Sequence, residues 1–279
     1  MEGALTRLAR HATSLLLLPA GLLLIAFLVV PLCATIWLSL TPSDIVHFQG
    51  HGFGNFSYML AKPYYRTVTI RTFRLAFETT AAALLIGYPT ALALTAVPPR
   101  IAATLSLAMT LPILSGPLVV VLGWMILLSD GGPILAHLPF IPSPLGTETG
   151  MAIGIVHFIL PFVVLSLAAV LRGIPAPLLE AANSLGANTW QRFTQVILPL
   201  SLQGILSATV IALSLSMSSF IAPHYLGGPS DLTLTTLVAQ FVLATYNGQM
   251  AAAVSVILLV AMAALILALT ILLSRSVRR

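Results

Sequence analysis

Six long runs of apolar residues, separated by short polar segments, dominate the sequence. They cover approximately residues 14–40, 73–97, 101–128, 150–171, 200–226 and 250–273. A helix crosses the hydrocarbon core of a bilayer with about 20 mostly apolar residues, so each run is long enough to span a membrane. The first run is longer than the 7–15-residue core of a signal peptide, so we expect it to be retained. The pattern predicts an all-α polytopic membrane protein with six transmembrane helices, forming a single domain over residues 1–279.

Composition supports a lipid environment. Hydrophobic residues make up 58% of the 279 positions and charged residues 7%, whereas a soluble domain carries about 25% charged residues. The net charge is +5, but the basic residues are scattered and not interleaved with aromatic ones. This distribution argues against nucleic-acid binding and favours arginines beside lipid head groups. Cys33 is the single cysteine, so no intrachain disulfide can form.

The basic residues of the short loops predict an orientation. With the N-terminus in the cytoplasm, four basic residues lie on the outside or near that interface: Lys62, Arg66, Arg71 and Arg74. The other eight lie inside: Arg7, Arg10, Arg100, Arg172, Arg192, Arg275, Arg278 and Arg279. This excess predicts that both termini are cytoplasmic. The external loops 41–66, 129–149 and 226–248 are rich in Gly and Pro, and they are either a docking surface or plain connectors.

The segment between the fourth and fifth runs, residues 172–199, contains the signals of two short helices. Pro177 and Glu180 suit the first turn of a helix, where a missing N–H costs little and a negative charge is favoured. Gly186 stands where a glycine would end that helix in a left-handed conformation. We expect a second short helix over about residues 188–197, before Pro199 opens the fifth span.

The first of these helices presents an apolar stripe. Leu178, Ala182 and Leu185 fall at positions i, i+4 and i+7. A helix this short is not stable alone, so another surface must cover the stripe. The small side chains of Ala181 and Ala182 permit close approach, which favours a docking element for a cytoplasmic partner. The alternative is a helix lying on lipid head groups, against which the segment has few basic residues.

The residues of this segment resemble a known motif. Glu180-Ala181-Ala182, then Gly186, then Ile197-Leu198-Pro199 resemble the EAA loop of permease subunits of binding-protein-dependent ABC importers. Residues 123–133 and 219–229 are similar to parts of the spermidine/putrescine group of these permeases, and the resemblance extends from about Phe53 to the C-terminus. Gln203 departs from the pattern, because the family usually has proline there.

The resemblance implies the fold and the partners of a type I ABC importer permease in a bacterial inner membrane. The EAA loop would form coupling helices that fit a groove in an ATPase subunit. The implied coupling residues are Glu180, Ala181, Ala182, Leu185 and Gly186, with Phe193, Leu198 and Pro199 anchoring the return to the membrane. The implied partners are two ATPase subunits that bind ATP, a second similar permease and an external substrate-binding protein. The implied substrate is a polyamine or a related small polar solute.

Motifs for chemistry on this chain itself are absent from the sequence. A P-loop needs Gly-Lys followed by Ser or Thr, but the single lysine, Lys62, is followed by Pro63. We therefore expect ATP on a partner chain, with no cofactor or catalytic residue here. The six histidines show no i, i+4 pair on a predicted helix, since His47 and His51 lie in a Gly-rich loop, so we expect no metal site. The alternatives to an importer subunit are a self-sufficient secondary transporter, for which no inverted repeat is evident, and a structural membrane protein.

Several polar and aromatic residues inside the runs are candidates for the translocation pathway. Ser216 and Ser219 share a helix face at i, i+3, and Tyr88 and Trp124 would suit a cationic amine. Close helix packing and membrane-interface aromatics are the alternative explanations. Glu78 either faces the pathway or pairs with Arg71 or Arg74. His157 lies within a span, where a hydrogen bond between helices is the more frequent role.

Overall fold

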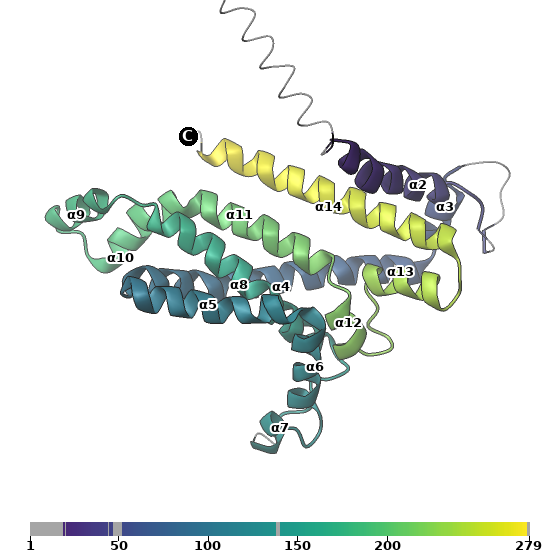
Figure 1. The fold of residues 1–279 in the computed structure, drawn as a ribbon, viewed down its shortest axis with the longest axis horizontal. Coiled ribbons are helices and arrows are strands. Elements are labelled where there is room, and N and C mark those ends of the chain that lie inside the picture. The colour runs from purple at the N-terminus through teal and green to yellow at the C-terminus, as the bar shows by residue number, and fades with distance from the viewer. Residues whose placement is uncertain (1–18, 20, 44, 47–51, 138–139, 278–279) are drawn as a thin grey trace, which may run out of the picture. The chain divides into compact units, whose positions relative to one another are not determined.

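The computed structural model describes residues 19, 21–43, 45–46, 52–137 and 140–277, with side chains described as far as residue 271, and within them the regular elements are helical (Figure 1). Six helical stretches in this part of the chain are long and apolar enough to cross a membrane. They are Gly21–Ser39, Pro63–Ala96, Pro117–His137, Glu148–Arg172, Thr189–Met217 and Gly248–Ile271. The prediction of an all-α protein with six membrane-spanning helices is confirmed. The start of the first predicted span, with Arg7 and Arg10, lies outside the described residues, as do Arg278, Arg279 and the side chain of Arg275.

The described residues divide into two compact units. One contains the described residues up to Lys62 together with Val238–Leu258, and the other contains Pro63–Leu237 together with the described residues from Leu259 onward. The boundaries fall inside helices α13 (Leu234–Leu243) and α14 (Gly248–Val277). The candidate functional residues discussed below belong to the second unit.

The first unit contains η1 (Ile25–Val29), α2 (Val30–Ser39) and α3 (Gly54–Ala61), with parts of α13 and α14. The buried amide of Asn55 donates to the carbonyl oxygens of Ser39 at 3.0 Å and Thr41 at 2.8 Å. Ser39 is the last residue of α2, where carbonyl groups have no partner within the helix, and Thr41 follows it by two residues. Asn55 therefore ties α3 to the end of α2. The residues of η1 and nearly all of α2 are exposed within this unit, as expected of a helix that faces lipid.

The core of the second unit forms where α4 (Pro63–Ala96) and α11 (Leu198–Met217) pack on α8 (Glu148–Arg172). Fully buried residues on α8 include Met151, Ile155 and Ile159, whose spacing of four residues gives one apolar stripe. Small residues allow the close approach of the helices. A Cβ atom on Gly87 of α4 would lie 2.7 Å from Val163, and one on Gly204 of α11 would lie 2.8 Å from Val170.

The third predicted span, residues 101–128, is not a single helix. Residues Pro99–Ser115 form α5 and residues Pro117–Leu128 form α6, and Gly116 separates them. Gly116 has φ +78° and ψ 154°, a conformation that is essentially restricted to glycine. Pro117 follows and lacks the N–H that would continue α5. By length and composition, the candidate span in this region is Pro117–His137, which contains α6 and α7 (Pro133–His137), and α5 is a shorter apolar helix.

The fifth predicted span, residues 200–226, also differs from the structure. It begins earlier, because α10 (Thr189–Arg192), the π-helix η2 (Phe193–Ile197) and α11 follow one another without a break. Pro199 lacks an N–H, and η2 passes this point by a wider turn in which the N–H of Leu198 donates to Phe193. The helix then ends at Met217, and α12 (Ile221–Leu226) continues after a short break. The second short helix expected over 188–197 is thus the start of the fifth span.

Candidate functional site

The turn after α9 (Ala176–Ser184) has the geometry expected of a helix that ends at a glycine. Gly186 has φ +78°. Its N–H donates to Asn183, and the N–H of Ala187 donates to Ala182, both at 3.0 Å. This pair of bonds is the Schellman motif. Nothing lies within 4 Å of a Cβ atom built on Gly186, so the backbone conformation, and not space, selects glycine here. The prediction that Gly186 ends the helix in this conformation is confirmed.

The start of α10 is fixed by a reciprocal cap. The side chain of Asn188 accepts from the N–H of Gln191 at 2.8 Å, and the side chain of Gln191 accepts from the N–H of Asn188 at 2.9 Å. Arg192 of α10 donates to the side chain of Asn183 of α9 at 3.2 Å. The polar groups at both helix ends are therefore satisfied within the segment. The result is a helix–turn–helix that is ordered by its own hydrogen bonds.

The outer face of this helix–turn–helix is apolar, and no described residue covers it. Leu185 is 88% exposed, Trp190 is 70% exposed, and Leu178 is also exposed. Ala182, predicted on the same stripe as the two leucines, is half-buried, whereas Glu180 and Ala181 are exposed. We call Leu178, Glu180, Ala181, Leu185 and Trp190 the loop surface. Trp190 was missed by the sequence analysis, although an aromatic residue directly after a helix cap was a visible signal.

The base of the loop is held by aromatic contacts and one hydrogen bond. The ring of Phe193 packs edge-on against Tyr88 at 5.9 Å and lies 5.8 Å from Trp190. The hydroxyls of Tyr88 and Ser201 share a hydrogen bond of 2.7 Å. Of the predicted anchoring residues, Phe193 thus contacts α4 through Tyr88. Leu198 and Pro199 begin α11, where Leu198 is half-buried and Pro199 is exposed.

A cluster of ion pairs lies toward the other end of α4. Arg71 pairs with Glu148 of α8 at 2.7 Å and with Asp231 at 3.6 Å, and it donates to the carbonyl oxygen of Ser230 at 2.5 Å. Arg74 pairs with Glu148 and, at 3.7 Å, with Glu78. Of the two roles left open for Glu78, the structure therefore shows the pairing with an arginine. We call Arg71, Arg74, Glu78, Glu148 and Asp231 the ion-pair cluster.

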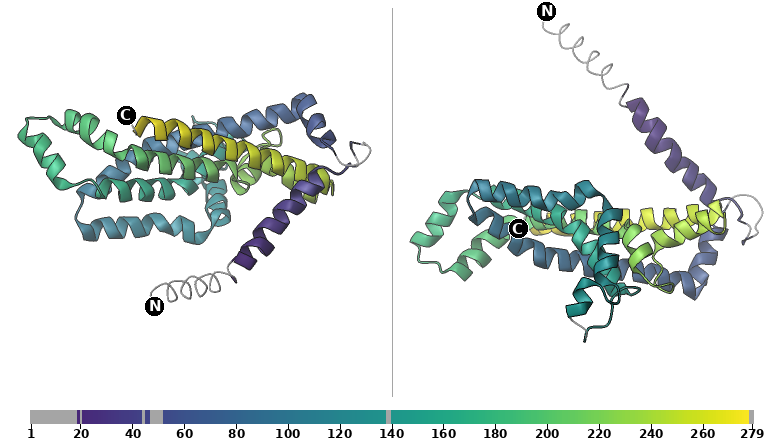
Figure 2. Two further views of the ribbon diagram at one scale, coloured as in Figure 1. Left: turned by 90° about the horizontal axis from the view of Figure 1, so that it is seen from above. Right: turned by 60° about the horizontal axis from the view of Figure 1, so that its bottom comes forward.

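The ion-pair cluster and the base of the loop lie at opposite ends of the second unit. Arg71 and Tyr88 are separated by 17 residues of one continuous helix, which corresponds to about 25 Å at 1.5 Å per residue. This separation is close to the thickness of the hydrocarbon core, about 30 Å. Figures 1 and 2 show α9 and α10 at one end of the second unit and α12 toward the other.

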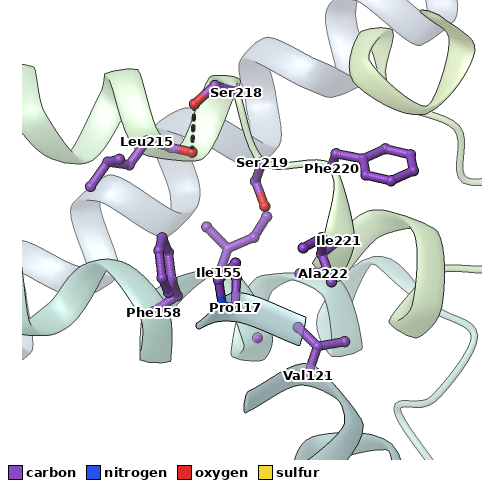
Figure 3. A pocket seen from close by; sticks show the side chains of 11 residues that line it. Pro117, Val121, Ile155, Phe158, Leu215, Ser218, Ser219, Phe220, Ile221 and Ala222 are labelled. Carbon is purple, nitrogen blue, oxygen red and sulfur yellow. Dashed lines mark hydrogen bonds between the residues drawn. The ribbon is translucent and has the colours of Figure 1, made fainter. Parts of the chain in front are cut away.

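The break between α11 and α12 opens a cavity of about 260 Å³. The hydroxyl of Thr235 donates to the carbonyl oxygen of Ser219 at 2.7 Å, and the N–H of Ser219 donates to Ser216 at 3.1 Å. These bonds hold the chain at the break. Residues of four elements line the cavity: Pro117 and Val121 of α6; Gly154, Ile155 and Phe158 of α8; Leu215 of α11 with Ser218–Phe220; and Ile221 and Ala222 of α12 (Figure 3).

The four pathway candidates do not lie together. Ser219 lines the cavity, and its side chain points toward Ile155 in Figure 3. Ser216 is buried and shares a hydrogen bond of 2.7 Å with Thr79 of α4, so it joins two helices. Tyr88 follows Thr79 by nine residues on α4, about 14 Å further along the helix.

Trp124, the fourth candidate, lies seven residues after Pro117 on α6, and hence on the helix face that contributes to the cavity. Its ring packs edge-on against His157 of α8 at 5.6 Å. His157 thus contacts an aromatic ring of a neighbouring helix. In the part of the chain that the structure describes, no group of three or more His, Cys, Asp or Glu side chains could hold a metal ion.

Comparison with known families identifies the class of this bundle. Residues 87–279 match the family described as the inner membrane component of binding-protein-dependent transport systems. The chain belongs to this family. It is 33% identical over 213 residues to the spermidine/putrescine transport system permease protein PotB of Haemophilus influenzae, with 74% of each chain covered. It is 29% identical over 214 residues to PotB of Escherichia coli K12, with 75% of this chain and 78% of PotB covered.

Solved structures of transporters share the fold. A chain of a bacterial ABC transporter involved in the import of the acidic polysaccharide alginate matches with a TM-score of 0.77, at 18% identity over 98% of each chain. A chain of the MetNI methionine ABC transporter in an inward-facing conformation matches with a TM-score of 0.59, at 22% identity over 77% of this chain and 95% of that one. The fold is that of a type I ABC importer permease.

These comparisons decide between the functional classes left open by the sequence. The prediction of a permease subunit of an ABC importer, multi-pass in a bacterial inner membrane, is confirmed by the family. A self-sufficient secondary transporter is not favoured. Permeases of this family work with ATPase subunits and with binding proteins. One of the matching structures contains a periplasmic protein loaded with an alginate pentasaccharide.

Proposed function

We propose that this chain forms part of the translocation pathway of an importer for a polyamine or a related small organic solute. The substrate class is supported by the similarity to the PotB proteins over about three quarters of the chain. In this proposal, residues 1–279 act as one permease domain that pairs with a second, similar permease. An external binding protein delivers the solute. The substrate chemistry of the alginate and methionine transporters does not transfer, because those similarities are limited to the fold.

The loop surface is the feature that carries the proposed mechanism. Leu178, Leu185 and Trp190 expose apolar area on a helix–turn–helix that is otherwise satisfied by its own hydrogen bonds. Exposed apolar surface of this kind is typical of a docking site. We propose that each of two ATPase subunits binds ATP, and that one of them docks on this surface. Glu180, Ala181, Ala182, Leu185 and Gly186 then form the first coupling element, and Phe193, Leu198 and Pro199 carry movement into the membrane.

The proposed orientation places residues 172–199 and both termini in the cytoplasm. It is supported by the excess of arginine in the corresponding loops. The ion-pair cluster then lies toward the external side. ATP hydrolysis takes place on the partner subunits, because this sequence contains no Gly-Lys-Ser/Thr motif for binding a triphosphate.

In the pathway itself, we propose direct roles for Ser219 and Trp124. Ser219 lies in the interruption of the fifth span, and Trp124 lies on the face of α6 that contributes to the cavity there. Discontinuous membrane helices commonly form substrate sites in transporters. Ser216 and Tyr88, predicted with them, are assigned to contacts between helices, since each shares a hydrogen bond with a neighbouring helix.

Purification of the chain with its partners tests the assignment of the loop. Affinity purification from the native membrane should recover an ATPase subunit, and the double substitution Leu185→Ala with Trp190→Ala should reduce that recovery. Phe140→Ala is the matched control, because Phe140 is also an exposed apolar residue, 78% exposed, but lies outside the loop. Equal loss of the ATPase in the control, or full recovery with the double variant, would contradict docking at this surface.

A further inference from the structure

The cavity at the break of the fifth span is apolar and aromatic in character. Phe158 and Phe220 contribute rings, and Val121, Ile155 and Ile221 contribute aliphatic side chains. No residue that lines it is titratable. Its volume, about 260 Å³, lies just below the 300–1,000 Å³ typical of sites for small molecules. The cavity therefore suits a slender aliphatic group and is too small for an oligosaccharide.

The two hydroxyls at the cavity differ in what they can offer to a ligand. The hydroxyl of Ser218 donates to the carbonyl oxygens of Ser214 at 2.8 Å and Leu215 at 3.2 Å, and Figure 3 shows the second of these bonds. The hydroxyl of Ser219 has no hydrogen bond to any described residue, and it points toward Ile155. Ser219 is half-buried. It is therefore the lining side chain that is placed to bind a polar group at the edge of an apolar space.

The acidic side chains in the described part of the second unit lie outside the cavity. Glu78, Glu148 and Asp231 are engaged with arginines in the ion-pair cluster. Asp130 and Glu180 are exposed and do not line the cavity. An ammonium group buried in the cavity would thus lose its water without gaining a counter-charge, which is strongly unfavourable. Methylene groups carry no such penalty and gain from leaving water.

We propose that this cavity binds the hydrocarbon spacer of an aliphatic amine. In this arrangement the Oγ atom of Ser219 accepts a hydrogen bond from an amino group that stays at the cavity edge. The chain then sorts substrates by the length of the spacer and not by their charge. The inference rests on the proposed function, because it assumes that an amine enters the pathway. Each additional methylene that fits the cavity raises the apparent affinity about fourfold.

The test uses the purified importer complex in proteoliposomes and compares uptake of 1,3-diaminopropane, putrescine and cadaverine. Uptake at low substrate should rise with spacer length until the cavity is filled. Ser219→Leu places a branched apolar side chain in the cavity and obstructs it, and it should lower putrescine uptake at least tenfold and abolish the length dependence. Ser219→Ala removes only the hydrogen bond, so uptake should fall about two- to tenfold with the length dependence kept.

Ser207→Leu is the matched control. Ser207 lies on α11, the helix that ends just before Ser219, is exposed, and donates its hydroxyl to the carbonyl oxygen of Gln203. We expect this variant to stay within about twofold of the unmodified complex. Recovery of the ATPase reports on assembly and should be unchanged in all three variants, and the basal rate of ATP hydrolysis should be unchanged in Ser207→Leu.

Two results would overturn the inference, and they differ in what else they affect. If Ser219→Leu keeps the length dependence of the unmodified complex, the cavity is not the spacer site, while amine import stands. If the unmodified complex hydrolyses ATP but takes up none of the three diamines, both the spacer site and the polyamine substrate are wrong. The assignment of the chain as a permease subunit would survive either result.

Discussion

Tyr88 of α4 and Ser201 of α11 share a hydrogen bond of 2.7 Å at the base of the loop. Tyr88 also packs edge-on against Phe193. The aromatic residue that sequence analysis placed in the pathway is therefore a contact between the loop and the membrane helices. These contacts connect α4 to the helical stretch that starts at Thr189, and under the proposed mechanism a movement of the loop would shift both helices.

Tyr88→Phe should weaken the contact between α4 and α11 without leaving a cavity in place of the ring. The ring contact with Phe193 remains, and only the hydroxyl bond to Ser201 is lost, which costs about 0.5–1.5 kcal/mol of stability. We expect solute uptake per ATP hydrolysed to fall, as measured in proteoliposomes. Tyr64→Phe is the control, because Tyr64 is half exposed and its hydroxyl has no described partner. Unchanged uptake per ATP in Tyr88→Phe would count against a role in coupling.

Gly186→Val should disturb the turn of the loop and leave membrane insertion intact. A residue with a Cβ pays about 1–2 kcal/mol in the left-handed conformation that Gly186 adopts, and a branched side chain pays more. We expect transport-coupled ATP hydrolysis to be lost while the chain still reaches the membrane. Gly123→Val is matched to it, since Gly123 also has open space around its Cβ position but lacks the positive φ. Normal coupling in Gly186→Val would contradict the assignment of the loop.

Glu180→Lys should weaken attachment of the ATPase. Glu180 is exposed on the loop surface, and reversing an exposed charge at a docking surface changes the binding free energy by about 1 kcal/mol, or the affinity about fivefold. The amount of ATPase recovered with the chain at two salt concentrations measures the effect, which should shrink at high salt. Asp130→Lys makes the same change of charge at an exposed site outside the loop. Equal recovery for the two variants would show that the position of the charge is irrelevant.

Arg71→Gln should destabilise the second unit more than Arg74→Gln. The side chain of Arg71 is 18% exposed and links Glu148, Asp231 and Ser230, whereas that of Arg74 is 53% exposed. Loss of a partly buried, charge-assisted contact costs about 1.5–3 kcal/mol, and loss of an exposed pair costs about 0–1 kcal/mol. Thermal unfolding of the purified variants compares them. The ranking would be wrong if Arg74→Gln lowered the Tm as much as Arg71→Gln.

Local signals were sufficient for part of this molecule. Apolar runs predicted the spans because a segment in lipid must be apolar and must form its backbone hydrogen bonds within its own helix. The helix end at Gly186 was predicted because such an end depends on a few neighbouring residues. The break at Gly116 was not predicted, since a single backbone angle interrupts the helix while the apolar run continues through it. The contacts of Tyr88 and the pairing of Arg71 with Glu148 were also beyond the sequence, because 113 and 77 residues separate the partners.

The helical stretch from Thr189 to Met217 connects the loop surface to the break beside Ser219. It is 29 residues long, or about 43 Å at 1.5 Å per residue. Trp190 stands at one tip and the break that exposes Ser219 lies just past the other. A tilt applied at Trp190 would reach Ser219 through this one helical stretch, and η2 with Pro199 is the place along it where the stretch can bend.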